Sequence, residues 1–266
     1  MKFNAEFSKF KGVFFDCDGV IWEESQLLPG ALETINYLIE TNLSFGFLSN
    51  NSTKSIKEYT KKFKSLGLNV EEYQVVSSVQ VTINYLKNLT DRNKTLYVIG
   101  ESGLSQSLKD AGFIVVEGTT NDIDAVIVGM DRNFTYKKLT IGLQACLKGA
   151  RFIATNPDPQ FPTPNGFFPG AGSMVGALSS ALNNNAPEII CGKPNPLMAK
   201  ILLERFNLKP QDVVMIGDRV STDLECAKNA GISSVLVKTG FGSQEFRLYP
   251  DFPYYSTINS LFDLFE

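Results

Sequence analysis

The sequence predicts an α/β protein with a doubly wound parallel sheet, and three observations support this prediction. Short apolar runs alternate with amphipathic helical patterns in the first part of the chain, as in βαβ units. The run at residues 213–216, Val-Val-Met-Ile, is apolar without alternation, which is typical of a strand whose sheet is covered on both faces. The same rhythm returns near the C-terminus after a long middle segment. We therefore expect a discontinuous Rossmann-like core with an inserted second domain.

The predicted elements follow one another regularly along the chain. The first part contains strands over 12–15 and 44–48 and helices over 30–40 and 53–66, the first of these helices beginning after the breaker Pro29. The middle part contains strands over 96–99, 125–128 and 152–154 and helices over 103–111, 136–147 and 173–182. The last part contains strands over 188–191, 212–216 and 234–237 and helices over 196–206 and 223–229. We expect residues 1–88 and 186–266 to form one domain and residues 89–185 to form the other.

Composition excludes several classes of protein. The chain has 266 residues, of which 43% are hydrophobic, enough for one large core or two moderate ones. Its formal net charge is −3 and it has no long run of Lys or Arg, so we do not expect it to bind nucleic acid. No apolar stretch reaches the roughly 18 residues of a membrane-spanning helix. Residues 1–11 mix charges with phenylalanines, unlike a signal peptide, so we expect a cytoplasmic protein without a membrane partner.

The absence of histidine limits the chemistry further. It removes the Ser-His-Asp and Cys-His nucleophile schemes, phosphohistidine intermediates and histidine-ligated zinc. The four cysteines, Cys17, Cys146, Cys191 and Cys226, lie far apart, and we interpret them as buried thiols rather than as a disulfide framework or a zinc site. Any reaction must therefore use carboxylates, Lys, Ser or Cys.

Polar residues follow four of the predicted strands. They are Asp16 and Asp18, then Ser49, Asn50 and Asn51, then Lys193, and finally Asp218 with Asp223. The carboxyl ends of strands in a doubly wound sheet converge on one crevice, so we expect these four sets to be neighbours. Two carboxylates at 4 Å repel by about 4 kcal/mol at an effective dielectric near 20, which calls for a cation, a shared proton or a substrate. Carboxylate oxygens suit Mg²⁺, while hydroxyl, amide and ammonium donors suit phosphate.

These motifs resemble a known family. Asp16-Cys17-Asp18-Gly19-Val20, a strand ending in Ser49-Asn50-Asn51, Gly192-Lys193-Pro194 and Gly217-Asp218-Arg219 with Thr222-Asp223 occur in the order of the four motifs of haloacid dehalogenase (HAD) superfamily phosphatases. The insert between Ser49 and Lys193 looks like a type C2 cap. Within it, Ala154-Thr155-Asn156-Pro157-Asp158 and Pro169-Gly170-Ala171-Gly172-Ser173 resemble subclass IIA, the NagD and 4-nitrophenylphosphatase branch.

The resemblance implies a Mg²⁺-dependent phosphatase that hydrolyses small phosphate monoesters through an aspartyl phosphate. Asp16 would be the nucleophile, and Asp18 the general acid and base. Asp16, Asp218 and the backbone carbonyl of Asp18 would hold Mg²⁺. Ser49 and Lys193 would hold the phosphoryl group with help from Asn50 and Asn51, and Asp223 would orient Lys193 or a metal-bound water.

The proline-rich stretch at residues 155–166 is predicted to be a shaped loop, and loops of this kind often contact substrates. We expect Asn156, Asp158 and Phe161 to select among small phosphorylated metabolites such as sugar phosphates, glycolate-like phosphates and nucleotides, with 4-nitrophenyl phosphate as a generic substrate. Relatives that hydrolyse pyridoxal phosphate carry a histidine where Phe161 aligns, so that activity is not expected. The sequence leaves open whether the protein forms a homodimer.

Alternative interpretations exist for each motif and for the whole chain. Alone, Asp16 to Gly19 could be a turn, and Lys193 could be a solvated surface lysine. Ser49, Asn50 and Asn51 could be turn and helix-cap residues, with Thr53 as the N-cap. Strand alternation points Cys17 away from the two aspartates, which disfavours a thiol nucleophile. At the level of function, a phosphotransferase, a phosphorylation-responsive receiver-like module and a catalytically silent scaffold of the same fold are the alternatives. A receiver has about half this length and no use for the insert.

Overall fold

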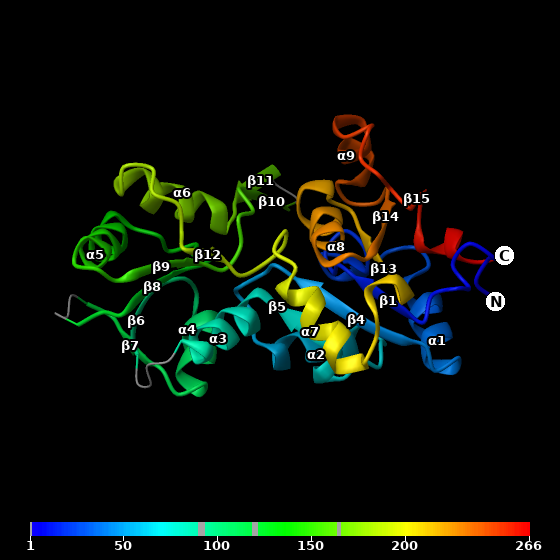
Figure 1. The fold of residues 1–266 in the computed structure, drawn as a ribbon, viewed down its shortest axis with the longest axis horizontal. Helices are drawn as coiled ribbons and strands as arrows, with labels where there is room; N and C mark the ends of the chain where they lie inside the picture. The colour runs from blue at the N-terminus through cyan, green and yellow to red at the C-terminus, as the bar shows by residue number, and fades with distance from the viewer. Residues whose placement is uncertain (1, 90–93, 119–121, 164–165) are drawn as a thin grey trace. The chain divides into compact units, whose positions relative to one another are not determined.

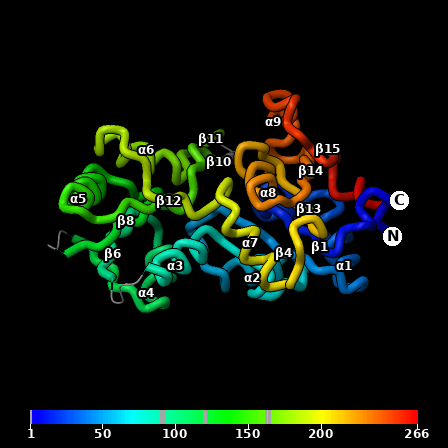
Figure 2. Tube along the Cα trace, in the orientation of Figure 1, coloured from blue at the N-terminus to red at the C-terminus, as the bar shows by residue number. Residues whose placement is uncertain are grey.

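A computed structural model describes residues 2–89, 94–118, 122–163 and 166–266. The chain folds into two compact units (Figures 1 and 2). Unit 1 consists of Met1–Ser49, Ile56–Val76 and Lys193–Glu266, and unit 2 of Asn50–Ser55 and Ser77–Gly192. Unit 2 is thus inserted twice into the sequence of unit 1. The domain boundaries expected from the sequence stay predictions.

Unit 1 is built on a six-stranded sheet with the strand order β15-β14-β13-β1-β4-β5. The strands are β1 (Gly12–Phe15), β4 (Ser44–Ser49), β5 (Val75–Ser77), β13 (Val213–Gly217), β14 (Ser233–Val237) and β15 (Ser256–Ile258). β1 pairs in parallel with both β4 and β13, and β14 and β15 continue the sheet in parallel. The central strands are apolar along their whole length because helices cover both faces.

The helices of unit 1 pack on opposite faces of this sheet, as the alternation of β1 requires. Val13 and Phe15 share a core cluster with residues of α1 (Ala31–Glu40) and α2 (Ile56–Ser65). Phe14, which points the other way, contacts Phe206 of α7 (Leu197–Phe206). α8 (Glu225–Ala230) packs against α7 and β14, and α9 (Gly242–Leu248) packs against β14. A small hairpin of β2 (Trp22–Glu23) and β3 (Gln26–Leu27) follows β1.

Unit 2 is a second α/β layer structure. Its parallel sheet has the order β12-β9-β8-β6-β7, with β6 (Thr95–Ile99), β7 (Ile114–Val116), β8 (Ala125–Val128), β9 (Arg151–Ala154) and β12 (Ile189–Ile190). α5 (Tyr136–Leu147) and α6 (Ala171–Ala181) lie on one face, and α3 (Ser78–Asn88) and α4 (Ser102–Asp110) lie on the other (Figure 1). The prediction of an α/β protein with parallel sheets is therefore confirmed.

Three local features differ from the sequence prediction. The loop expected at 155–166 contains a strand, because β10 (Gln160–Thr163) pairs with β11 (Gly166–Pro169) as an antiparallel hairpin. Pro164 and Asn165, which belong to the same prediction, lie outside the described residues. The helix expected at 223–229 begins with one π-helical turn, Val220–Leu224, before α8. Cys17, Cys191 and Cys226 are buried as expected, but Cys146 is only half-buried.

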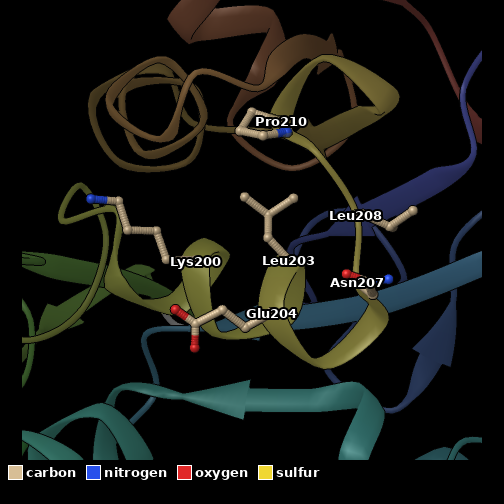
Figure 3. A pocket seen from close by; sticks show the side chains of 6 residues that line it. All are labelled: Lys200, Leu203, Glu204, Asn207, Leu208 and Pro210. Atoms are coloured by element: carbon tan, nitrogen blue, oxygen red, sulfur yellow. The ribbon is translucent and has the colours of Figure 1, made fainter.

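Two further observations concern the surface and the helix lengths. Unit 1 has a hollow of about 320 Å³ beside α7, lined by Lys200, Leu203, Glu204, Asn207, Leu208 and Pro210 (Figure 3). None of the predicted site residues lines it. Among the residues that the structure describes, no helix is both long enough and apolar enough to cross a lipid bilayer.

Candidate active site

The predicted site residues of unit 1 gather where the central strands end. The register aligns Phe15 of β1 with Phe47 of β4 and with Ile216 of β13. Asp16 extends this alignment, since its backbone N–H donates to the carbonyl oxygen of Ile216 at 2.9 Å. Parallel strands in register therefore bring Asp16 and Asp218 to the same edge of the sheet.

Lys193 joins the carboxylates of Asp16 and Asp223. Its ammonium lies 2.5 Å from Asp16 Oδ1 and 2.6 Å from Asp223 Oδ1, and it donates to the carbonyl oxygen of Leu48 at 3.0 Å. The side chain of Lys193 is 2% exposed and that of Asp223 is 1% exposed. The interpretation of Lys193 as a solvated surface lysine is therefore wrong, because its side chain is buried. A buried ammonium needs charged partners, and Asp16 and Asp223 supply them.

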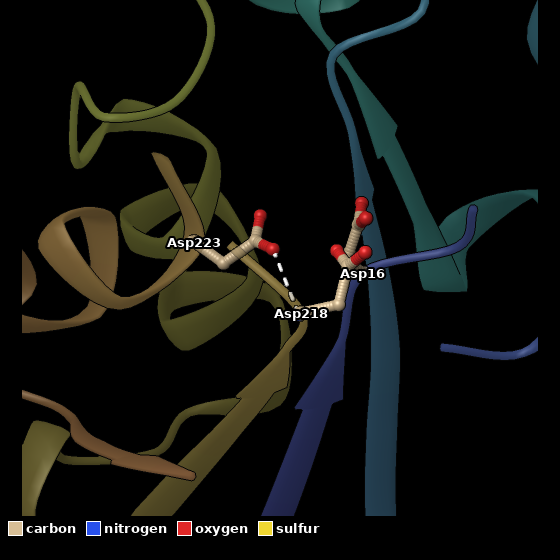
Figure 4. Close-up of side chains that lie close together, drawn as sticks. All are labelled: Asp16, Asp218 and Asp223. Carbon is tan, nitrogen blue, oxygen red and sulfur yellow. Dashed lines mark hydrogen bonds between the residues drawn. The ribbon is translucent and has the colours of Figure 1, made fainter. Parts of the chain in front are cut away.

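Three carboxylates form a cluster that could hold a metal ion. Asp16, Asp218 and Asp223 each offer one oxygen, and these oxygens lie within 4.8 Å of one another (Figure 4). Asp223 accepts hydrogen bonds from the backbone N–H groups of Asp218 at 3.2 Å and Arg219 at 3.0 Å, the first of which is the dashed line in Figure 4. Asp218 accepts one from the backbone N–H of Phe241 at 2.8 Å. Backbone donors thus orient the carboxylates of Asp218 and Asp223.

Glycines leave the space that this cluster needs. A Cβ atom at Gly217 would overlap the side chain of Asp223, and one at Gly19 would overlap the carboxylate of Asp218. Gly19 also has a φ of 83°, in the left-handed region that glycine adopts without strain. The glycines of the first and fourth motifs therefore let charged side chains approach the backbone closely.

Burial and mutual repulsion make the site electrostatically strained. Burial raises the pKa of Asp16, Lys193 lowers it, and Asp223 and Asp18 raise it, so that the net pKa is about 7. Burial also raises the pKa of Asp218 well above its ordinary value, and Asp223 and Asp16 add to this. For Lys193, burial lowers the pKa, but the Asp16 and Asp223 carboxylates outweigh burial and the net direction is upward.

The donor set fits a hard divalent cation. Three carboxylates, of which Asp218 and Asp223 are buried and Asp16 is half-buried, leave two uncompensated negative charges beside one ammonium when all are ionised. Oxygen-only ligands of this kind suit Mg²⁺, which keeps several waters and needs few protein oxygens. Asp223 shares this cluster, whereas the sequence prediction had given the third metal position to Asp18.

Asp18 lies apart from the buried cluster. Its side chain is 58% exposed, and its Oδ1 accepts a hydrogen bond from the indole N–H of Trp22 at 2.8 Å. The ammonium of Lys62 lies 4.0 Å from the same oxygen and 4.0 Å from the centre of the Trp22 ring. An exposed carboxylate with one oriented oxygen is able to exchange protons with substrate or water.

Ser49, at the end of β4, is buried and contacts a tyrosine. Its Oγ lies 2.6 Å from the hydroxyl oxygen of Tyr59 in α2. Both side chains belong to residues that are 1% exposed. Ser49 is thus held within unit 1 by a partner that the motif does not contain.

Asn50, Asn156 and Asp158 form a separate group within unit 2. The Asn50 amide donates to Asp158 Oδ2 at 3.1 Å, and the Asn156 amide donates to the carbonyl oxygen of Asn50 at 2.7 Å. The Asn156 side chain also accepts from the backbone N–H of Asp158 at 3.2 Å. These contacts attach the segment that follows Ser49 to the loop after β9.

The two remaining predicted residues have local partners. Asn51 Oδ1 accepts from the backbone N–H of Thr53 at 2.9 Å and from its hydroxyl at 2.7 Å, as in the turn that the sequence left as an alternative. Phe161 packs edge-on against Phe168 across the hairpin, with 6.2 Å between ring centroids.

Sequence reasoning missed Trp22, Tyr59 and Lys62. A signal for Tyr59 existed, because Tyr59 and Phe63 are four residues apart and lie on the face of α2 that is buried. A buried tyrosine needs a partner for its hydroxyl, but the pattern alone does not say which one.

Comparison with known proteins identifies the family. A family described as haloacid dehalogenase-like hydrolase matches residues 13–114, and one described as HAD-hydrolase-like matches residues 190–264. Dihydroxyacetone phosphatase of Corynebacterium glutamicum is 37% identical over 250 residues, which cover 94% of this chain and 88% of that protein. Acid sugar phosphatase of Staphylococcus haemolyticus is 36% identical, with 89% and 88% covered.

A solved structure gives the same result for the fold. The crystal structure of 4-nitrophenylphosphatase from Thermotoga maritima superposes with a TM-score of 0.89 at 31% identity, covering 98% of each chain. The resemblance to the 4-nitrophenylphosphatase branch that the motifs indicated is confirmed. The chain belongs to the haloacid dehalogenase-like hydrolases.

Proposed function

We propose that this protein is a Mg²⁺-dependent phosphatase that hydrolyses small phosphate monoesters through an aspartyl phosphate on Asp16. The observation that carries this proposal is the buried arrangement in which Lys193 joins Asp16 to Asp223, with the Asp218 carboxylate beside them. Phosphoryl transfer needs mainly positioning and neutralisation of charge on the phosphoryl oxygens, and this arrangement offers both.

The reaction proceeds in two displacements. In the first, a carboxylate oxygen of Asp16 forms a bond to phosphorus while the bond to the ester oxygen breaks, and Asp18 gives its proton to the leaving oxygen. In the second, Asp18 takes a proton from water as the water oxygen attacks phosphorus, which releases Asp16 and inorganic phosphate. The exposed position of Asp18 supports this role, since its carboxyl group has access to both leaving group and water.

Lys193 and Ser49 bind the phosphoryl oxygens in this scheme. The Lys193 ammonium touches Asp16 directly, so it is placed to neutralise charge next to the nucleophile. Asp223 positions Lys193 through the second ion pair. Asn50 assists from the residue after Ser49.

Asp16 and Asp218 would hold Mg²⁺, with the backbone carbonyl of Asp18 as a further ligand and Asp223 beside them. When bound, the cation supplies positive charge that stabilises the phosphoryl oxygens and the ionised form of Asp16. The upward shifts in the pKa values of Asp16 and Asp218 support the need for such a charge.

We propose that unit 2 is the type C2 cap domain of this protein and that it selects the substrate. The named relatives are a dihydroxyacetone phosphatase and an acid sugar phosphatase, which supports phosphorylated small metabolites as the substrate class. Asn156, Asp158 and Phe161 are the residues of unit 2 that we expect to contact the rest of the substrate.

Phosphate release from 4-nitrophenyl phosphate, measured with Mg²⁺ and with excess EDTA, tests the proposal. Wild-type protein should release phosphate only with Mg²⁺, and Asp16→Asn should be inactive, because the amide is nearly isosteric but does not attack phosphorus. Asp212→Asn, at an exposed ion pair with Lys11, is the matched control and should be fully active. Activity in EDTA, or more than about one per cent of the wild-type rate in Asp16→Asn, would contradict the mechanism. Adding an acceptor alcohol and measuring transfer products separates hydrolysis from phosphotransfer.

A further inference from the structure

We propose that Tyr59 is a positioning residue that fixes the Ser49 hydroxyl as a hydrogen-bond donor toward the phosphoryl group. This inference rests on the proposed function, because it concerns how Ser49 binds phosphate. Tyr59 lies outside the four sequence motifs, and in the described part of the chain its hydroxyl makes its hydrogen bond with Ser49.

The geometry of the contact is that of a strong hydrogen bond. The two hydroxyl oxygens lie 2.6 Å apart, at the short end of the range for O–H···O bonds. Both residues belong to unit 1, and both are 1% exposed. Bulk water therefore does not compete for either hydroxyl.

The direction of this hydrogen bond follows from where the phenolic proton can go. Burial raises the pKa of the Tyr59 phenol well above its ordinary value, so the phenol keeps its proton at neutral pH. That proton needs an acceptor, and in the described part of the chain the Tyr59 hydroxyl contacts Ser49 Oγ. If Ser49 donated instead, the phenolic proton would be buried without an acceptor, which is costly. Tyr59 therefore donates and Ser49 accepts.

The direction of this hydrogen bond determines where the proton of the Ser49 hydroxyl points. A serine hydroxyl has one proton and can accept two hydrogen bonds. Since Ser49 accepts from Tyr59, its own proton points away from the phenol. A donor with a fixed direction contributes more to binding a phosphoryl oxygen than a freely rotating hydroxyl, because no reorientation is needed when the substrate arrives.

Packing holds the phenol in place. Phe47 and Ser49 are two residues apart on β4 and share one face of the strand, while Tyr59 and Phe63 are one helical turn apart on α2. The Phe47 and Phe63 rings pack with 4.4 Å between centroids, and the Trp22 ring lies 4.8 Å from Phe63. The aromatic contact one turn along thus packs α2 against β4 beside the pair of Tyr59 and Ser49.

A double-mutant cycle tests this inference. The variants are Tyr59→Phe, which keeps the ring and removes the hydroxyl, Ser49→Ala, and the two together. Tyr37→Phe is the matched control, because Tyr37 is a half-buried tyrosine of unit 1 whose hydroxyl accepts a backbone hydrogen bond at 3.4 Å from Phe3. For each protein we would measure kcat and KM for 4-nitrophenyl phosphate, the dissociation constant of inorganic phosphate by calorimetry with Mg²⁺, and thermal stability.

The inference predicts non-additive effects on phosphate. Tyr59→Phe should lower kcat/KM and weaken inorganic phosphate binding by about five- to twentyfold, as expected for one misdirected hydrogen bond. In the Ser49→Ala background, Tyr59→Phe should change either quantity by less than about twofold, because its route to the phosphate is gone. Tyr37→Phe should match wild type.

Two results would overturn the inference while leaving the proposed function standing. One is wild-type kinetics and phosphate affinity in Tyr59→Phe, and the other is multiplication of the two single effects in the double variant, as a purely structural role would give. Failure of the wild-type protein to hydrolyse 4-nitrophenyl phosphate would overturn the proposed function instead. Even then, the calorimetric comparison of phosphate binding would decide whether Tyr59 positions Ser49 or has a purely structural role.

Discussion

Replacing Lys193 by methionine is the perturbation whose effect can be worked out most fully from the structure. Methionine has a similar length and no charge, so the change removes the ammonium with little change in volume. Asp16 and Asp223 then lose the cation that lies 2.5 Å and 2.6 Å from their oxygens. Asp223 is 1% exposed and Asp16 is 13% exposed, so solvent replaces little of this interaction.

The expected loss of stability is large for a single side chain. Removing one partner of a buried ion pair costs about 3–5 kcal/mol, because the remaining charge is left buried without compensation. For a protein of this size, 1 kcal/mol shifts the melting temperature by about 2–4 °C, so Lys193→Met should melt roughly 10 °C lower when Mg²⁺ is absent. Part of the loss should return in Lys193→Met/Asp223→Asn, which also removes one uncompensated carboxylate.

Thermal unfolding in EDTA, followed by circular dichroism, measures this effect. The matched control is Lys11→Met, which breaks the ion pair of Lys11 with Asp212 at 3.3 Å, where the lysine side chain is 67% exposed. Such a surface pair contributes about 0–1 kcal/mol, so this variant should melt within a few degrees of wild type. Equal melting temperatures for Lys193→Met and Lys11→Met would refute the argument that the Lys193 network is buried and tightly paired. The phosphatase rate of Lys193→Met should also fall, by about a hundredfold or more.

Three further predictions concern the cation, pH and the cap loop. Asp218→Asn should raise the Mg²⁺ concentration for half-maximal phosphatase rate at least about tenfold, and an unchanged Mg²⁺ titration would remove Asp218 from the metal site. The pKa of Asp16 is raised from 3.8 to about 7, chiefly by burial, so between these values the folded protein holds a proton that the unfolded chain has lost. Without Mg²⁺, Asp16 therefore makes the unfolding free energy fall as pH rises through this window, and Mg²⁺ should raise the melting temperature more at pH 8 than at pH 5; the opposite order would contradict the assignment. Asp158→Ala should reorder activities on a panel of phosphorylated metabolites while 4-nitrophenyl phosphate changes by less than about threefold, since cap contacts supply binding energy to remote groups. An unchanged rank order would exclude this role.

The parallel sheets could be predicted from the sequence because their physical cause is local. The apolar runs of β1 and β13 have no alternation, and this pattern follows directly from helices on both faces. The hairpin of β10 and β11 was missed since prolines at 162, 164 and 169 argue against strands. Proline is tolerated in an isolated two-stranded ribbon, where part of each backbone needs no partner.

The candidate site could be predicted in its carboxylates and its lysine, but not in the side chains that orient them. Strand ends converge by topology, which is why Asp16, Asp218 and Asp223 were expected together. Lys193 was expected for the same reason, but the strand that precedes it, β12, pairs with β9 in the sheet of unit 2, so the topology of the unit 1 sheet does not explain its position. The partner of Ser49 depends on how α2 packs against β4, and nothing in the local pattern of either element specifies that contact. Asn51 shows the reverse case, because its contacts with Thr53 are local and a turn was one of the expected alternatives.

The charges around Lys193 also explain how a chain without histidine could catalyse the proposed phosphoryl transfer. A histidine base is one way to generate a nucleophile near neutral pH, but a carboxylate needs no base once it is ionised. Burial works against ionisation here, since it raises the pKa of Asp16, which is about 7 even with Lys193 beside it. Lys193 opposes the effect of burial but is shared with Asp223, so one ammonium serves two carboxylates and Asp218 lies beside them. A divalent cation that balances the remaining charge would shift Asp16 fully to its nucleophilic form. Chelation would then stop the reaction in two ways at once, by removing charge stabilisation of the phosphoryl group and by protonating a large fraction of the nucleophile at neutral pH.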